Sequence, residues 1–443
     1  MANYTLPLGS KMLSKQFTYG VATASFQIEG GVEHRLPCIW DTFCATEGKI
    51  ADQSNGDVAC DHFHKWSEDI DLIDSLGVDA YRLSLSWPRL IKEDGSLNED
   101  GATFYINILD KLIAKGIKPF VTLYHWDLPQ HLEDNGGWLN RDTAYKFAEY
   151  TDIVTKAFGD RVHSYATLNE PFCSSYLGYE VGIHAPGKVG KEYGRKSAHH
   201  LLLAHGLAMQ VLKKNVPAAK NGIVLNFTPC YSATDSAADI AATQFADDYF
   251  NQWYIKPIFD KEYPAIINQL PKEHQPDIHD GDMEIIAQTI DFLGVNFYTR
   301  AIYKADEQEV FEQLEPPEPR TDIGWEIYPQ AFTNLLTDLD SKYSLPPVYI
   351  TENGAAMADQ LENAQVNDLD RVDYYQAHLN AVNDAIEAGV NIQGYFAWSL
   401  MDNFEWAEGY LKRFGIVYVD YVSQTRTIKQ SGLLYRDLIN SRT

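Results

Sequence analysis

Two short motifs place a glutamate where its carboxyl group could carry out acid–base or nucleophilic chemistry. Glu170 lies within TLNEP, residues 167–171, and Glu352 lies within ITENG, residues 350–354. Both motifs include short runs of residues that favour β-strands. When two carboxyl groups face one bond, one can attack as an anion while the other donates a proton. The sequence therefore predicts a site built around a pair of glutamates.

Other side chains with recognition chemistry stand at the ends of the predicted strands. They are Gln27, Arg82, His125, Trp126, Asn169, Asn296, Tyr298, Trp398, Glu405 and Trp406. Amides, carboxylates and an imidazole bond to hydroxyl groups, and indole faces pack on sugar rings. Together with the two glutamates, this set favours hydrolysis of a glycosidic bond. No aligned set of histidines and carboxylates indicates a divalent ion, so no metal ligand is predicted.

The predicted neighbours of each glutamate assign the two carboxyl groups different roles. We expect Arg82 and Tyr298 to approach Glu352 and keep it ionised as the nucleophile. Glu170 lacks such a cation and begins protonated, its pKa raised by apolar walls and by the charge of Glu352, which makes it the acid/base. Asn169 is expected to bond the sugar 2-hydroxyl. Carboxyl groups about 5–5.5 Å apart retain the anomeric configuration, whereas inversion needs a wider gap.

The elements that must hold these residues follow a recurring pattern. Helical segments end at Gly77, Gly116, Gly159 and Gly389, where a left-handed cap favours glycine, and a short β-rich run follows each. The eight predicted strands are residues 17–26, 80–86, 118–123, 163–168, 222–227, 292–296, 348–351 and 392–398. Eight βα units close a barrel, so the predicted class is α/β, a single (β/α)8 TIM barrel with residues 1–443 as one domain.

An open doubly wound sheet is the alternative that the same pattern allows. No G-x-G-x-x-G follows the first strand, which removes the main support for a dinucleotide-binding fold. In a barrel, reactive groups gather at the C-terminal ends of the strands. Strands four and seven can then bring Glu170 and Glu352 together across the mouth.

Composition limits the classes of partner. The chain has 443 residues, 45% of them hydrophobic, and a formal net charge of −26. That charge disfavours nucleic acid and anionic membrane surfaces, but it says little about a neutral substrate. The expected partner, from the site residues, is a small sugar-containing molecule. No run of about 18 apolar residues occurs, and the first 17 residues lack the apolar run of a secretion signal. A cytoplasmic setting is the default expectation, with a processed secreted form as the alternative.

Two polar segments and several histidines have simpler interpretations. Residues 305–320 are predicted to form a solvated loop, and residues 357–370 a polar loop after the seventh strand. His62 and His64 are predicted to pack structurally because the sequence suggests no third metal ligand beside them. The same interpretation applies to His199, His200 and His205.

The motifs as a set are similar to those of glycoside hydrolase family 1, the β-glucosidase family. Besides TLNEP and ITENG they are GVATASFQIEG, YRLSLSWPR, TLYHWDLP, GVNFYTR, WSLMDNFEWAEGY and RFGIVYVD, which together span nearly the whole chain. The resemblance implies a (β/α)8 barrel, a retaining double displacement and no cofactor. It implies that glucose is held by Gln27, His125, Asn169, Glu352, Trp398, Glu405 and Trp406. It further implies a platform for the leaving group at Trp325, and outer walls at Cys173, Leu177 and His184.

The resemblance also discriminates between branches of that family. Members that act on 6-phosphorylated sugars replace the Glu-Trp pair, which stands complete here as Glu405 and Trp406. Thioglucosidase relatives carry glutamine where this chain has Glu170. One departure follows Gly30, where the connection is shorter than usual and Val32 replaces a common tryptophan. It bears on the outer rim and on aglycone preference.

The predicted function is hydrolysis of terminal non-reducing β-D-glucosyl residues from cello-oligosaccharides and from aryl or alkyl β-glucosides. Three alternatives stay open: β-galactosidase or β-fucosidase activity, transglycosylation, and a catalytically silent sugar-binding relative. A single axial hydroxyl changes few contacts, which keeps the first alternative open. Retention of both glutamates favours an enzyme over the silent binder. The sequence gives neither the linkage preference nor the oligomeric state.

Overall fold

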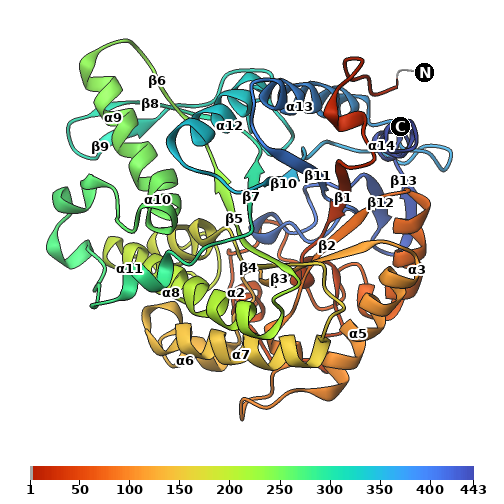
Figure 1. The fold of residues 1–443 in the computed structure, drawn as a ribbon, viewed down its shortest axis with the longest axis horizontal. Coiled ribbons are helices and arrows are strands. Elements are labelled where there is room, and N and C mark those ends of the chain that lie inside the picture. Colours follow the sequence, from red (N-terminus) through yellow and green to blue (C-terminus); the bar gives the residue numbers. More distant parts are fainter. Residues whose placement is uncertain (1–2) are drawn as a thin grey trace.

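The computed structural model describes residues 3–443, and its centre is a closed barrel of eight parallel strands (Figure 1). The order around the barrel is β1-β11-β10-β7-β5-β4-β3-β2. The strands are β1 Thr18–Ala22, β2 Ala80–Ser84, β3 Lys118–Tyr124, β4 Ser164–Asn169, β5 Lys220–Phe227, β7 Phe292–Phe297, β10 Val348–Asn353 and β11 Ile392–Trp398. The predicted α/β class and the (β/α)8 barrel are confirmed.

Helices cover the outside of the barrel (Figure 1). The longer ones are α3 His62–Ser75, α5 Glu99–Ala114, α7 Asp142–Phe158, α8 Lys191–Asn215, α9 Ala237–Asp247, α10 Trp253–Asp260, α12 Gln330–Lys342, α13 Leu369–Glu387 and α14 Gln430–Asn440. The shorter ones are α1 Ser25–Ile28, α2 Ile39–Cys44, α4 Trp87–Leu90, α6 Gln130–Asp134 and α11 Asp282–Ile286. The first predicted strand was too long, because residues 25–28 turn into α1, and Gln27 therefore projects from a helical turn.

Close packing between β10 and β11 brings two site-bearing strand ends together. Gly354 follows Glu352 at the exit of β10, and a Cβ atom there would lie 1.7 Å from the backbone oxygen of Trp398. Since no side chain fits that distance, glycine is required for the exit of β10 to pass so close to the exit of β11. The nucleophile candidate and the Trp398 indole are thereby fixed relative to each other.

A small sheet outside the barrel corrects the prediction for residues 305–320. β8 Ala301–Asp306 pairs in parallel with β6 Cys230–Ser232 and antiparallel with β9 Val310–Gln313. The segment is therefore partly a strand hairpin, because its alternation over a few residues was too short to register as a strand. Residues 357–368 do form an irregular loop before α13, as predicted. A second hairpin joins β12 Val417–Asp420 and β13 Thr425–Ile428.

A buried group of charges ties that loop and the exit of β11 to the C-terminal helices. Lys429 Nζ lies 2.5 Å from Asp359 and 2.6 Å from Asp402. Arg371 pairs with Asp359 at 2.8 Å, and Arg413 pairs with Asp402 at 2.6 Å. Because Asp402 shortly precedes Glu405, these pairs hold the segment that carries Glu405 over the barrel.

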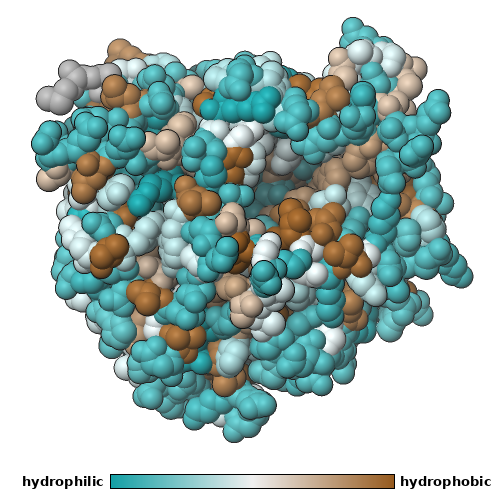
Figure 2. Space-filling view, turned by 180° about the vertical axis from the view of Figure 1, so that it is seen from behind, coloured by the Kyte–Doolittle hydropathy of each residue, from teal (hydrophilic) through white to brown (hydrophobic). Residues whose placement is uncertain are grey.

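The C-terminal residue lies beside the segment that precedes β1, where Thr443 donates its backbone N–H to the oxygen of Leu13 at 3.0 Å. The outer surface is mostly hydrophilic in the view of Figure 2, with hydrophobic residues in small separate groups. Among residues 3–443, no helix combines the length and the apolar composition needed to cross a membrane.

Replacement of the central cation of the buried charge group should destabilise the protein. Lys429→Met removes one cation from two buried carboxylates, which we expect to lower Tm by about 5 °C in thermal unfolding. The matched control is Lys342→Met, which breaks an exposed pair with Asp338 and should change Tm by less than about 1 °C. Equal Tm values for the two variants would show that the buried group contributes nothing.

Candidate active site

A cavity opens among the loops at the C-terminal ends of the barrel strands. Its volume is ≈ 730 Å³, which lies in the range of sites for small molecules. The predicted site residues that line it are His125, Trp126, Glu170, Tyr298, Trp325, Glu352, Trp398, Glu405 and Trp406. Residues far apart in the sequence therefore meet around one space, with both glutamates among them.

Glu352, at the exit of β10, is buried and held by a cation and a phenol. Arg82 Nη1 donates to Glu352 Oε1 at 2.6 Å, and the Tyr298 hydroxyl donates to Oε2 at 2.6 Å. Burial raises the pKa of this carboxyl, while the charge of Arg82 and the Tyr298 bond both oppose that rise. The two contacts expected from the sequence are present, and both favour the carboxylate form.

Glu170 follows β4 and receives its hydrogen bonds from neutral groups. Asn296 Nδ2 donates to Oε1 at 2.6 Å, and Cys173 Sγ donates to Oε2 at 3.0 Å. Burial raises the pKa of Glu170 to about 8, with the negative charge of Glu352 as the next cause. The group is therefore mostly protonated at neutral pH, as a proton donor must be.

Two asparagines connect these carboxyl groups. Asn169 Oδ1 accepts from Arg82 Nη2 at 2.7 Å and from Asn296 Nδ2 at 3.1 Å. Asn296 also accepts from Thr351 at 2.6 Å, and its hydrogen bonding helps to lower the pKa of Glu352. Asn296 is fully buried and its amide links the surroundings of the two glutamates. The sugar contact expected of it from the sequence stays a prediction.

Two buried polar atoms are left for a ligand. Within residues 3–443, Gln27 Oε1 and His125 Nδ1 are buried without a hydrogen-bond partner. Gln27 is oriented by Asn403, to which its Nε2 donates at 2.9 Å, and His125 Nε2 lies 3.1 Å from Asn169. Buried polar atoms are normally paired, and these two remain available to bond a hydroxyl group of a ligand. Glu405 adds a carboxyl whose pKa burial raises to about 8.

Aromatic rings enclose the same space. The His125 ring is nearly parallel to Trp398 and to Trp406, with centroids 5.9 Å apart in each case. Trp126 lies 4.5 Å from Trp406 and donates its indole N–H to the backbone of Asn169. Trp325, which is half-buried, lies 5.3 Å from the ring of Tyr298. These rings give a pyranose flat apolar faces beside the polar groups.

Comparison with known proteins assigns the family. The family model described as glycosyl hydrolase family 1 matches residues 9–443. The chain belongs to that family. A β-glucosidase of Agrobacterium sp. is 45% identical over 431 residues, which are 95% of this chain and 94% of that protein. A 1,4-β-D-glucan glucohydrolase of Thermotoga neapolitana is 44% identical over 438 residues, which are 97% and 99% of the two chains.

Solved structures agree with this family 1 assignment. The β-glucosidase from Thermotoga maritima in complex with glucoimidazole superposes with a TM-score of 0.94 at 43% identity. The alignment covers 97% of this chain and 98% of that one. The resemblance read from the sequence motifs is thus confirmed at the level of the family and the fold.

The structure adds lining residues of the family 1 cavity that the sequence did not indicate. Gln313, Leu314 and Pro316 lie in the segment predicted to be a solvated loop, yet they form part of the cavity wall. Only the packing of the β8–β9 hairpin brings them there. Cys173, Leu177 and His184 also line the cavity, at the positions where the family resemblance placed the outer walls.

Other polar residues near the strand ends serve the framework. Glu29 bonds Arg89 at 2.9 Å and also accepts from Tyr105, so it is engaged away from the cavity. His62 pairs with Asp69 at 2.8 Å, and His199 pairs with Asp282 at 2.8 Å. The structural role predicted for these two histidines fits their contacts. His64 differs, because it is exposed.

Three cavity residues have a left-handed backbone that non-glycine residues rarely adopt. The φ angles are 79° at Trp126, 46° at Glu170 and 50° at Trp406. Such conformations cost roughly 1–3 kcal/mol each and cluster at functional sites. Shortly after Glu170 the chain forms a π-helical segment, Cys173–Glu180, and its first residue, Cys173, places its thiol against the Glu170 carboxyl.

The raised pKa of Glu170 predicts the alkaline limit of activity. Because the protonated form is needed, kcat/KM should fall as pH rises through the pKa of about 8. Cys173→Ala removes a hydrogen bond that lowers this pKa, so the alkaline limb of the pH profile should move to higher pH.

The control for this experiment is Cys44→Ala, which removes a thiol outside the cavity lining and should leave both limbs in place. An alkaline limb in wild type near pH 5, or a shift to lower pH in Cys173→Ala, would contradict the assignment of the proton donor.

Proposed function

We propose that this family 1 chain is a retaining β-glucosidase. It releases terminal non-reducing β-D-glucosyl residues from cello-oligosaccharides and from aryl or alkyl β-glucosides. The observation that carries the proposal is the unequal setting of two buried carboxyl groups in one cavity. Glu352 contacts Arg82 and Tyr298, whereas Glu170 is bonded by neutral donors and has a pKa raised to about 8. Such a pair supplies one anion and one acid.

In the first step, a Glu352 oxygen attacks the anomeric carbon while Glu170 gives its proton to the departing glycosidic oxygen. The bond to the aglycone breaks as the glycosyl ester forms. Tyr298 and Arg82 contact the two Glu352 oxygens, so they orient the carboxylate for attack. The contact of Asn296 with Glu170 and its effect on the Glu352 pKa support a narrow gap between the carboxyls, which suits retention.

In the second step, the same glutamate acts as a base. Once Glu352 is esterified, its negative charge no longer raises the pKa of Glu170. Glu170 therefore loses its proton more readily and can accept one from water, which attacks the anomeric carbon and frees Glu352. The electrostatic coupling between the two groups thus supplies the change in role that double displacement needs.

The glucosyl unit is recognised by Gln27 and His125, which carry buried atoms without a partner in residues 3–443, and by the residues around them. Gln27 Oε1 and Glu405 face the hydroxyls at the far end of the ring, and His125 Nδ1 bonds a hydroxyl nearer the anomeric carbon. Trp398 and Trp406 pack on the apolar faces. We propose that Trp325 contacts the leaving group, since this half-buried side chain lines the cavity beside Tyr298.

Azide should restore turnover when either glutamate is replaced by glycine, and the two variants should give azide products of opposite anomeric configuration. Glu352→Gly should lower kcat on 2,4-dinitrophenyl β-glucoside at least about 10⁴-fold. Azide can then occupy the nucleophile's position and give the α-glucosyl azide, whereas in Glu170→Gly it attacks the glycosyl-enzyme and gives the β-glucosyl azide. NMR of the products distinguishes the two.

Glu408 also lines the cavity, so Glu408→Gly is the matched control and should keep its activity without azide. The role assignment fails if Glu352→Gly turns over normally or yields the β-azide.

Glu405 should exclude 6-phosphorylated sugars. A phosphate beside Glu405 is repelled by the charge of Glu352 and raises further the pKa of the Glu405 carboxyl, which burial already raises to about 8. We therefore expect kcat/KM for p-nitrophenyl β-glucoside to exceed that for its 6-phosphate by at least about 100-fold. Glu405→Ser should reduce that ratio, and Glu408→Ser should not. Equal kcat/KM values for the two substrates in wild type would overturn this reading of Glu405.

We also infer the setting and extent of the enzyme. The Cys173 thiol must stay reduced to donate to Glu170, which fits a reducing cytoplasm. Residues 1–443 act as one catalytic domain, because α14 returns to the start of the barrel. There Tyr435 donates to the backbone of Gly20 at 2.9 Å, and Arg442 pairs with Asp79 at 2.7 Å.

A further inference from the structure

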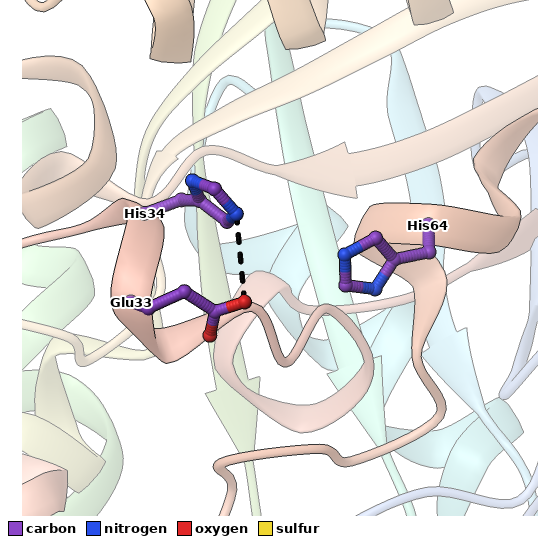
Figure 3. Close-up of side chains that lie close together, drawn as sticks. All are labelled: Glu33, His34 and His64. Carbon is purple, nitrogen blue, oxygen red and sulfur yellow. Dashed lines mark ion pairs between the residues drawn. The ribbon is translucent and has the colours of Figure 1, made fainter.

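A group of potential metal ligands lies outside the catalytic cavity. Glu33 and His34 belong to a short 3₁₀ turn, Val32–His34, and His64 lies in the first turn of α3. One ligand atom from each residue lies within 4.8 Å of the other two. Figure 3 shows the three side chains directed into the space between the turn and the helix. None of the three lines the cavity around the glutamates.

The two imidazoles are held in place by their neighbours. The ring of Phe63 stacks on His34 with centroids 4.7 Å apart, and it meets His64 edge-on at 5.2 Å. Arg89 lies over the same Phe63 ring at 4.5 Å. Because Phe63 contacts both rings, the two imidazoles lie near each other before any ion arrives, which lowers the entropic cost of the small rotations that binding requires.

A carboxylate orients His64 as in many metal sites. Asp61 Oδ1 lies 2.6 Å from His64 Nδ1. When Nδ1 donates to that carboxylate, Nε2 keeps its lone pair and becomes the ligand atom. The sequence suggested no third ligand beside His64, because Glu33 and His34 are 30 residues away along the chain and meet it only in the folded state.

We propose that Glu33, His34 and His64 bind a divalent transition metal of the zinc class. Two imidazoles and one carboxylate suit Zn²⁺, Ni²⁺ or Cu²⁺, whereas Ca²⁺ and Mg²⁺ prefer oxygen ligands alone. Zinc needs ligand atoms about 2.0–2.2 Å from the ion. The three side chains are at least half exposed, at 61%, 50% and 55%, so they can rotate inward to reach that distance, with water as the fourth ligand.

The bound ion would cross-link the turn to α3 and close the intervening segment, residues 35–61. That segment carries Trp40, whose ring lies 4.6 Å from Trp406 in the cavity wall. An ion that binds the folded form alone stabilises it by mass action. The site is thus a clamp between the turn and α3, outside the cavity lining, and the catalytic carboxyls are not its ligands.

The test uses the full-length protein without a histidine tag, stripped with EDTA and then dialysed. Calorimetric titration with ZnCl2 should show one site per chain, and Co²⁺ should give visible ligand-field absorption. We expect His34→Asn and His64→Asn to weaken Zn²⁺ binding at least about 100-fold, and Asp61→Asn to weaken it about 10-fold. Zinc should raise Tm in wild type and not in His64→Asn.

The matched control is His279→Asn, because His279 is an exposed imidazole beside a carboxylate, Asp277, at 3.2 Å. The His279→Asn variant should bind Zn²⁺ as tightly as wild type. Turnover of p-nitrophenyl β-glucoside by all variants in EDTA verifies that they fold. The proposal is wrong if wild type shows no stoichiometric site, or if His64→Asn binds as tightly as wild type. Zinc inhibition that persists in His64→Asn would place the ion at the catalytic carboxyls instead and would equally overturn the clamp.

Discussion

The ion pair between Arg82 and Glu352 is the interaction on which the rest of the site depends. Both side chains are almost fully buried, at 3% and 4% exposure, and a carboxylate removed from water needs a partner or takes up a proton. Arg82 is that partner for Glu352. The second carboxyl, Glu170, shares the same dry space and feels the first charge. One arginine thus decides which glutamate is the anion and which is the acid.

The barrel makes this asymmetry rigid. Arg82 comes from β2, Asn169 from β4, Asn296 from β7 and Glu352 from β10, and their side chains form one bonded chain across the mouth. Each of these side chains bonds at least one other, so rotation of any member would leave further buried polar atoms unpaired. The unfavourable backbone of Glu170 is maintained by the same surroundings.

Chemistry and selectivity are carried by different layers of the molecule. The reacting carboxyls stand on strand ends, where the backbone is fixed by the barrel. The outer cavity is shaped by Gln313, Leu314 and Pro316 on the small outer sheet and by Trp325. The segment between β1 and α3 reaches Trp406 through Trp40 of α2. Changes in these outer segments can therefore alter leaving-group preference while the double displacement stays intact.

The sequence determined the barrel, the family and the two glutamates, because strand periodicity, glycine stops and contiguous motifs are local properties of the chain. It also indicated Arg82 and Tyr298 as partners of Glu352, since strand order around a barrel makes their side chains converge. It did not indicate that Asn296 donates to Glu170, and it misjudged residues 305–320, where Gln313 forms part of the cavity wall.

The tertiary structure alone decided contacts between segments that no motif joins. His34 meets His64 across 30 residues of chain because Phe63 contacts both rings, and Trp40 lies against Trp406 from the other end of the sequence. Such contacts depend on distances and angles between elements. Those follow from packing of the whole chain, and residue order by itself does not contain them.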